Sequence, residues 1–300
     1  MKPLRTAVFP VAGLGTRSFP ATKVIPKEML TVVDKPIIQF AVEEARAAGI
    51  ESLVFVTSRG KTLMEDHFDQ HRELYEMLDR RGKVVELASA RAAEIPVGQL
   101  TCVRQPEPLG LGHAVWCARN VVRDEPFAVL LPDELFLCEK PLLAQLVEIY
   151  NEYGGNIIAV SEVPKDQTAR YGIVDPGEDD GRIATVRGLV EKPDPHEAPS
   201  NLSIVGRYIL QPQVMDVLSR GLVGKGGEVQ LTDAMARLIG LQPFHAARFE
   251  GHRFDCGGRA GFVAANVAYG LQRPDLADAV RAALAPVLAE DQERQAEAAS

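Results

Sequence analysis

Short apolar runs alternate with segments of helical spacing along most of the chain. Residues 6–10 (TAVFP) and 52–58 (SLVFVTS) are apolar enough for buried strands. Between them, residues 35–49 carry an apolar stripe at every third or fourth position, with a proline in the first turn and a glycine at the end, which predicts a helix. Residues 61–95 are charged, have helical spacing and predict a helical insertion. This order predicts an α/β fold built in layers.

The same alternation continues to residue 163. LTCVRQ, PFAVLLPDE and NIIAVSEV have the composition of strands, whereas GHAVWCARNVV and KPLLAQLVEIYNEYGG have helical spacing. Strands that are joined through helices pair in parallel. We therefore predict a Rossmann-like, mostly parallel sheet flanked by helices over residues 1–163.

After Pro164 the sequence becomes rich in turns and β-forming residues. PGEDDGR has the composition of a hairpin turn, and VMDVLSRG, QLTDAMARLIG and RAGFVAANVAYGLQ have helical spacing. We predict a smaller β-rich portion, residues 164–272, so that residues 1–272 form one domain. In the tail, residues 273–300, we expect a helix that ends before Pro286 and a frayed end beyond it.

Composition and net charge exclude some classes of binding partner and indicate the cellular compartment. Hydrophobic residues make up 46% and charged residues 25% of the 300 residues, as in ordinary globular proteins. The net charge of −8 argues against broad binding to nucleic acid or to an anionic membrane, because both need a basic surface. The sequence shows neither a signal peptide nor an apolar run of membrane-spanning length, and its 4 cysteines lack the spacing of a zinc site. We expect a cytoplasmic protein with reduced cysteines.

The segment VAGLGTRSFPATKVIPKEML, directly after the first strand, is the strongest candidate for a binding site. Gly13 and Gly15 match two glycines of the dinucleotide motif G-x-G-x-x-G, but a serine takes the third place and no Walker G-K-[ST] follows. Glycines after a strand let backbone N–H groups approach an anion closely. Thr16 adds a hydroxyl group, Arg17 a forked guanidinium and Lys27 a second cation. These features predict a polyphosphate site; the alternative is a solvated basic loop.

Eight motifs resemble, in order, those of the sugar-phosphate nucleotidylyltransferases, and of their UTP-dependent branch in particular. They are GLGTRSFPATKVIPKEMLTVVDKPIIQ, QPEPLGLGHAV, LLPDE, YGIVDP, LVEKPDP, SNLSIVGRYIL, GEVQLTDA and FDCGG. The resemblance covers about residues 5–272. It departs at Thr31, where the family usually has proline, and at Glu134, where this branch more often has valine. It implies the fold of the nucleotide-diphospho-sugar transferases, with a β-rich sugar-binding portion.

The resemblance also implies a reaction. A phosphate oxygen of glucose 1-phosphate attacks the α-phosphorus of UTP, which gives UDP-glucose and pyrophosphate. Mg2+ is the implied cofactor, with Asp133 and Asp255 as its ligands, although Asp133 could instead cap a turn. The implied assembly is a homo-oligomer, a dimer or a tetramer. On the nucleotide side the implied catalytic cations are Arg17 and Lys27, and the implied binding residues are Ala12, Gly13, Gly15, Thr16, Glu28, Gln105 and Gly110.

On the sugar side, the resemblance implies that Glu191 binds sugar hydroxyl groups and that Lys192 binds the sugar phosphate and takes part in catalysis. Backbone contacts are implied at Gly172 and Val205. His113 could lie near the substrate or only support the adjacent helix. A sister enzyme that uses dTTP or another nucleotide remains an alternative, because one methyl group discriminates weakly. So does a non-catalytic homologue that binds a nucleotide sugar.

Overall fold

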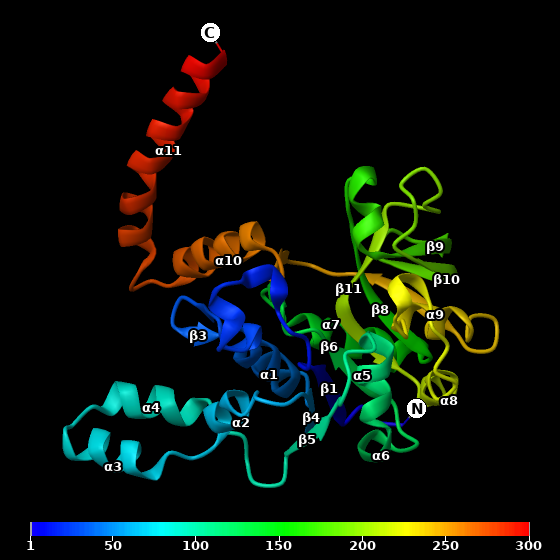
Figure 1. Cartoon of the computed structure of the whole chain (residues 1–300), viewed down its shortest axis with the longest axis horizontal. Helices are drawn as coiled ribbons and strands as arrows, with labels where there is room; N and C mark the ends of the chain where they lie inside the picture. Colours follow the sequence, from blue (N-terminus) through cyan, green and yellow to red (C-terminus); the bar gives the residue numbers. More distant parts are fainter. Residues whose placement is uncertain (1, 300) are drawn as a thin grey trace.

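The computed structural model describes residues 2–299, which form a nine-stranded sheet with helices on both faces (Figure 1). The strand order is β5-β4-β1-β6-β11-β8-β12-β10-β9, and two short pairs, β13-β7 and β2-β3, lie outside this sheet. The strands are β1 (Thr6–Pro10), β2 (Thr31–Val32), β3 (Lys35–Pro36), β4 (Ser52–Thr57), β5 (Leu100–Arg104), β6 (Phe127–Leu130), β7 (Glu134–Leu137), β8 (Asn156–Glu162), β9 (Gly172–Asp179), β10 (Ile183–Glu191), β11 (Leu202–Leu210), β12 (Phe244–Arg248) and β13 (His252–Asp255).

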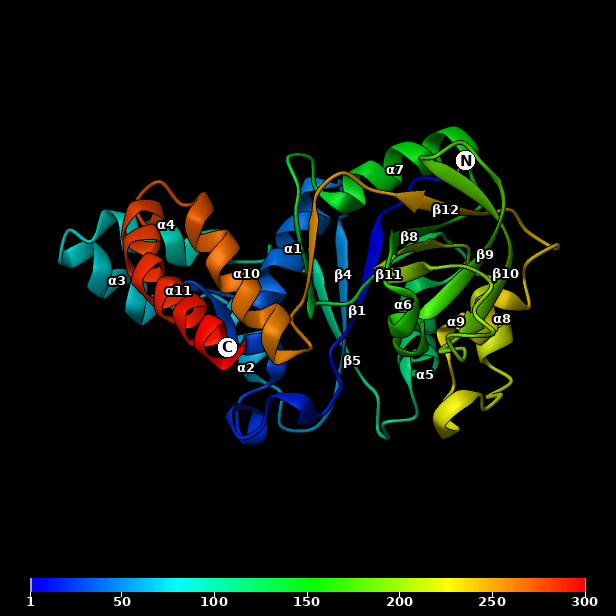
Figure 2. The same cartoon turned by 90° about the horizontal axis from the view of Figure 1, so that it is seen from above.

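Helices cover the sheet because successive strand residues face opposite sides. Ala7 and Phe9 of β1 pack with α1, α2 and α7, whereas Val8 packs with α5, α6, α8 and α9. Figure 2 shows α7 on one side of the sheet and α5, α8 and α9 on the other. The helices are α1 (Ile37–Ala47), α2 (Leu63–Phe68), α3 (Arg72–Arg80), α4 (Val84–Ala92), α5 (Leu111–Cys117), α6 (Arg119–Val122), α7 (Leu142–Tyr153), α8 (Val214–Leu218), α9 (Leu231–Ala236), α10 (Arg259–Gln272) and α11 (Ala277–Ala299).

The first half of the sheet is parallel, as the sequence predicts. β1 pairs in parallel with β4 on one side and β6 on the other, and β5 pairs in parallel with β4. β1 runs over the residues that the apolar run indicated. The parallel half, β5-β4-β1-β6, therefore has its carboxyl ends at one edge, which is where ligands bind in open α/β sheets.

The second half corrects the prediction of a mostly parallel sheet. β11 pairs antiparallel with β6, β8 and β9, and β10 pairs antiparallel with β9 and β12, so that β8–β12 is the one parallel pair of this half within residues 2–299. The contact between Ser203 of β11 and Ile173 of β9 closes these strands into a small barrel-like element. The predicted hairpin is confirmed, since β9 and β10 pair across residues 180–182. The sheet is mixed because its second half is built from hairpins and long returns.

Two helical parts lie away from the sheet. The predicted insertion consists of α2, α3 and α4. The tail differs from the prediction, because α11 continues through Pro286 to Ala299 and projects from the body (Figure 1). A proline inside a helix removes one hydrogen bond, here to the carbonyl of Ala282. Ala282 is exposed, so water can solvate the freed carbonyl. None of the helices within residues 2–299 has the length and apolar character needed to cross a bilayer.

Candidate active site

The glycine loop, residues 11–16, leaves the carboxyl end of β1. Within residues 2–299, the backbone N–H groups of residues 12–15 have no hydrogen-bond acceptor. Gly15 has φ of 66°, and a Cβ atom there would lie 3.1 Å from Cβ of Lys27, so glycine is needed at this position. Gly13 and Leu14 are exposed. The loop thus presents several unpaired donors to solvent, which is the arrangement that binds phosphate groups.

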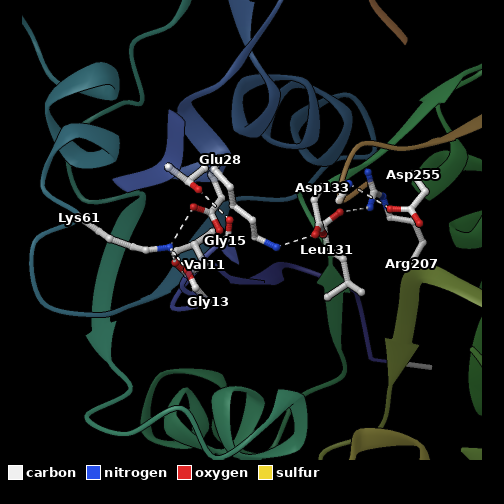
Figure 3. A network of polar contacts seen from close by, with 12 residues as sticks. Val11, Gly13, Gly15, Glu28, Lys61, Leu131, Asp133, Arg207 and Asp255 are labelled. Atoms are coloured by element: carbon white, nitrogen blue, oxygen red, sulfur yellow. Dashed lines mark hydrogen bonds and ion pairs between the residues drawn. The ribbon is translucent and has the colours of Figure 1, made fainter. Parts of the chain in front are cut away.

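Lys27 forms an ion pair with Asp133, which Figure 3 labels beside the loop residues Gly13 and Gly15. Nζ of Lys27 lies 2.5 Å from Oδ2 of Asp133. Burial alone would lower the pKa of Lys27, but attraction to Asp133, with a smaller contribution from Glu28, raises it above its ordinary value. Burial would likewise raise the pKa of Asp133, and Lys27 outweighs this effect and lowers it. Both groups are therefore charged at neutral pH.

Asp255 lies next to Asp133 because β13 pairs with β7. A Cβ atom on Gly257 would lie 3.0 Å from Oδ1 of Asp255, 3.1 Å from Oδ2 of Asp133 and 2.7 Å from Nη2 of Arg17. The two carboxylates and the guanidinium therefore surround one point. Within residues 2–299 no group of three or more His, Cys, Asp or Glu residues is placed to hold a metal ion. Two carboxylates suit Mg2+, which takes its remaining ligands from phosphate and water.

Gln105 and Gly110 lie together at the start of α5. The amide nitrogen of Gln105 donates to the Gly110 carbonyl at 3.1 Å and lies 3.0 Å from Nδ1 of His113. His113 therefore contacts Gln105, and its nearness to the substrate stays a prediction. A Cβ atom on Gly110 would lie 2.7 Å from Cβ of Glu228, so a side chain does not fit there. Contact of Gln105 and Gly110 with a base stays a prediction.

Glu28 is fully buried and pairs with Lys61, a residue that the sequence did not single out. Nζ of Lys61 lies 3.0 Å from Oε2 of Glu28, and Oε1 has no partner within residues 2–299. Burial raises the pKa of Glu28 against the attraction of Lys61. Burial also lowers the pKa of Lys61 against the attraction of Glu28. Since Glu28 is closed off from solvent here, its predicted contact with the nucleotide stays a prediction.

A cavity of about 190 Å³ brings together the sugar-side residues and opens to Arg17 and the two aspartates. Oε2 of Glu191 accepts a hydrogen bond from Oγ1 of Thr232 at 2.6 Å, and Oε1 lies 3.0 Å from Nζ of Lys192. A Cβ atom on Gly172 would lie 3.0 Å from Oγ1 of Thr232, so glycine keeps this space open. Val205 is fully buried on β11 next to a residue that lines the cavity, and its contact with sugar stays a prediction.

Three arginines near the site were not singled out by the sequence. Nη2 of Arg170, which lines the cavity, lies 3.6 Å from Oδ2 of Asp255. Nε of Arg253 donates to Oε2 of Glu134 at 2.5 Å and ties β13 to β7. The third, Arg207, is fully buried. Arg170 and Arg253 lie in segments whose composition is ordinary for a surface, so the sequence carried no signal for them.

Arg207 supports the turn that carries Asp133. Its guanidinium donates to the carbonyl of Leu131 at 2.9 Å and to that of Glu134 at 3.0 Å, on either side of Asp133. It also forms a forked pair with the carboxylate of Glu44 on α1. The sequence did contain a signal here, because Arg207 interrupts an apolar strand, and a cation in such a run is either exposed on one face or buried with a partner.

A larger cavity of about 420 Å³ lies between α8 and α9. Asp233 and Arg237 are the charged side chains among the residues that line it. It therefore lacks the converging cations and carboxylates of the glycine-loop site, and we do not place the chemistry there.

Comparisons with known proteins give the family of the chain. The sequence model of the family described as "Nucleotidyl transferase" matches residues 7–271. The UTP–glucose-1-phosphate uridylyltransferase of Komagataeibacter xylinus is 53% identical over 259 residues, 86% of this chain and 91% of the relative. The Bacillus subtilis (strain 168) protein of that name is 48% identical over 278 residues, 93% of this chain and 95% of the relative.

Solved structures give the same result. The UTP-bound UGPase from Acinetobacter baumannii is 42% identical with a TM-score of 0.87, covering 94% of this chain and 99% of that chain. A UDP-glucose pyrophosphorylase complexed with UDP-glucose is 37% identical with a TM-score of 0.81, covering 90% of this chain and 100% of that chain. Since the family match spans residues 7–271 and the solved structure with a TM-score of 0.87 covers 94% of the chain, this chain belongs to the nucleotidyl transferase family.

Proposed function

We propose that this protein is an enzyme that forms UDP-glucose and pyrophosphate from UTP and glucose 1-phosphate. The observation that carries this function is the position of the glycine loop, whose unpaired N–H groups lie beside Lys27 and Arg17, while Arg17 also lines the cavity of Glu191 and Lys192. One site can thus receive a triphosphate next to a sugar phosphate. The names of the relatives, and the bound UTP and UDP-glucose in two related structures, support these substrates.

The reaction is a displacement at phosphorus. A phosphate oxygen of glucose 1-phosphate forms a bond to the α-phosphorus of UTP, and the bond from that phosphorus to the bridging oxygen of the β-phosphate breaks. Pyrophosphate leaves with this electron pair. Because both reactants are polyanions, the protein has to neutralise charge and hold the two phosphates in line.

The residues of the site divide this work. N–H groups of the loop at Ala12, Gly13 and Gly15, with the hydroxyl of Thr16, bind the triphosphate, and Arg17 neutralises the departing pyrophosphate. Lys27 stabilises the charge that develops on the α-phosphate. Asp133 and Asp255 would hold Mg2+, which supplies further charge neutralisation between the attacking and reacting phosphates.

Specificity comes from the two ends of the site. Gln105 and Gly110 contact uracil, with Oε1 of Gln105 as the acceptor left over from its internal bonds. Glu28 lines the base pocket only if the loop around it opens. Glu191 and Lys192 bind the sugar hydroxyls and the sugar phosphate, and the backbone at Gly172 and Val205 shapes the pocket.

We further propose residues 1–272 as the catalytic unit, with residues 273–300 outside it. The family match to residues 7–271 and the projecting position of α11 support this division (Figure 1). The 4 cysteines are free thiols, which fits the expected cytoplasmic location. Self-association into a dimer or a tetramer stays a prediction.

Competition between nucleotides tests the proposed function. The purified protein is incubated with glucose 1-phosphate, Mg2+ and equal concentrations of UTP, dTTP, CTP and ATP, and the nucleotide sugars are separated. We expect UDP-glucose as the main product, and pyrophosphate release only when nucleotide, sugar phosphate and divalent metal are all present. Preferential use of dTTP would identify a sister enzyme, and binding without turnover would identify a non-catalytic homologue; either result overturns the proposal.

A further inference from the structure

We propose that Lys61 is a positioning residue that turns the N–H groups of the glycine loop toward the triphosphate. This inference rests on the proposed function, since it assigns Lys61 to the binding of the same nucleotide. Lys61 lies between β4 and α2, outside the loop itself. Its side chain approaches the loop from the side opposite to Asp133. Lys61 is not among the residues that line the cavity on the sugar side.

All three donors of the Lys61 ammonium are used. Nζ donates to the carbonyl of Val11 at 2.5 Å, to the carbonyl of Gly13 at 2.6 Å and to Oε2 of Glu28 at 3.0 Å. The side chain is only 9% exposed. An ammonium has three hydrogens and no acceptor, so this geometry satisfies Lys61 completely and leaves it nothing with which to bind a ligand directly.

The direction of these carbonyls fixes the direction of the next N–H groups. A trans peptide is planar, and its C=O and N–H bonds point in opposite directions. The one cis peptide bond within residues 2–299 is at Phe19–Pro20, so the bonds after Val11 and Gly13 are trans. Because both carbonyls point to Lys61, the N–H groups of Ala12 and Leu14 point away from it. The side chain of Thr22 repeats the pattern by donating to the Gly15 carbonyl at 2.7 Å.

These N–H groups point to the side of the loop where the proposed catalytic residues lie. Figure 3 shows Lys61 on one side of Val11 and Gly13, and Asp133 on the opposite side. Lys27 also lies against the loop, with its Cε 3.8 Å from the Cβ position of Gly13, and it extends to Asp133. The donors at Ala12 and Leu14 therefore face the side of the loop on which the Lys27–Asp133 ion pair lies. Leu14 thereby joins the residues whose backbone binds the triphosphate, although its side chain is exposed.

Glu28 allows Lys61 to be buried behind the loop, because its carboxylate balances the charge of the ammonium. A buried ammonium that met only two carbonyls would be an unpaired charge in a poorly solvated place. The carboxylate of Glu28, fully buried and 3.0 Å away, is its counter-ion. The pair therefore has two separable roles: charge compensation between Glu28 and Lys61, and orientation of the loop carbonyls by Lys61 alone.

Substitution of Lys61 by methionine tests the proposal. Methionine has similar length but no donor, so Lys61→Met frees the two carbonyls, and we expect the Kd of UTP, measured by calorimetry, to rise by about tenfold or more. The KM for glucose 1-phosphate at saturating UTP should stay within about twofold, because the sugar side is untouched. Lys23→Met, which removes an exposed lysine nearby, is the control and should bind UTP like the wild type.

A double variant separates orientation from charge compensation. Glu28→Gln alone and Glu28→Gln/Lys61→Met are compared, both measured well below their melting temperatures. If Lys61 orients the loop, the double variant binds UTP about tenfold more weakly than Glu28→Gln does. Equal UTP binding by these two variants, or loss of thermal stability in Lys61→Met with unchanged Kd, would overturn the proposal. If the wild type prefers another triphosphate, the proposed function fails, and the same variants are measured with that nucleotide.

Discussion

The two halves of the sheet recognise their ligands by different parts of the chain. In the parallel half, the groups assigned to the proposed triphosphate are unpaired backbone N–H groups of residues 12–15, of which Lys61 orients those of Ala12 and Leu14 through the carbonyls of Val11 and Gly13. In the antiparallel half, the groups assigned to the proposed sugar are the side chains of Glu191 and Lys192. Glu191 pairs with Lys192 and also accepts a hydrogen bond from Thr232. In the proposed site, the loop of the parallel half thus offers backbone donors to the triphosphate beside the cations Arg17 and Lys27, whereas the antiparallel half offers mainly side chains to the sugar.

This difference determines which substitutions matter. A backbone donor is lost only when the residues that hold the backbone change, so the parallel half should be sensitive at positions that do not touch the ligand. A side-chain contact is lost directly, so the antiparallel half should be sensitive at its lining residues. β11 joins the two halves, because one of its edges pairs with β8 and the other pairs with β6 and, at Ser203, with β9.

The largest expected effect, on the free energy of unfolding, comes from removing Arg207, which lies on the strand β11 that joins the two halves. Arg207→Met leaves the carboxylate of Glu44 buried without its partner and frees the carbonyls beside Asp133, so we expect a loss of about 3–5 kcal/mol in the free energy of unfolding. Urea denaturation measures it. Arg207→Met/Glu44→Met, which removes both charges, should recover a large part of the loss. A loss in Arg207→Met below about 1 kcal/mol would show that the halves do not depend on Arg207.

The sequence predicted the parallel half better than the antiparallel half. β1 and the helix after it were visible because apolar runs and helical stripes are local patterns. The pairing of β11 with β6 and β9 joins residues far apart in the chain, and no local pattern reports whether such a pair is parallel. From the sequence we predicted that Pro286 ends the helix. In this exposed helix the lost hydrogen bond costs little, so α11 continues through Pro286.

The same distinction applies to the site. Gly15, Arg17, Lys27 and Asp133 stood in motifs, and the structure brings them together. Lys61 stood in SRGKT, where a lysine between turn residues has the composition of a solvated loop; only the fold shows that its ammonium is buried. Positioning residues are difficult to find from sequence because their partners are backbone carbonyls, which every residue has.

The next effect in size tests the cation that the two halves share. Lys27→Ala removes the charge beside the reacting phosphates, and we expect kcat to fall by about 10²–10³-fold. The melting temperature should change little, because Asp133 keeps Arg17 as a neighbouring cation. Lys23→Ala, at an exposed position four residues earlier, is the control. A kcat for Lys27→Ala near that of the wild type would contradict the proposed mechanism.

A smaller effect, on the KM for glucose 1-phosphate alone, should show that sugar binding and nucleotide binding can be changed independently. Thr232→Val keeps the shape of the side chain but removes the hydroxyl that holds Oε2 of Glu191 at 2.6 Å. We expect the KM for glucose 1-phosphate to rise by roughly three- to tenfold while the Kd of UTP stays unchanged, the reverse of the result expected for Lys61→Met. Thr185→Val on β10, whose hydroxyl bonds within the hairpin, should change neither constant. Equal losses for both substrates in Thr232→Val would mean that the halves are not separable.

The smallest effect concerns an ion pair at the outer edge of the antiparallel half. The carboxylate of Asp179 accepts two hydrogen bonds of 2.9 Å from Arg248 and one from the N–H of Gly181, and these bonds lower its pKa. A lowered pKa stabilises the fold above the unfolded pKa of about 3.9 and is lost as the pH falls through the folded value. Asp179→Asn should therefore cost about 0.5–1 kcal/mol in the free energy of unfolding at pH 7, because a partly solvated pair is weak. The difference from the wild type should shrink as the pH falls below the unfolded pKa of about 3.9. A difference that stays constant between pH 7 and pH 3 would mean that the shape of the hairpin, and not the charge of Asp179, stabilises this edge.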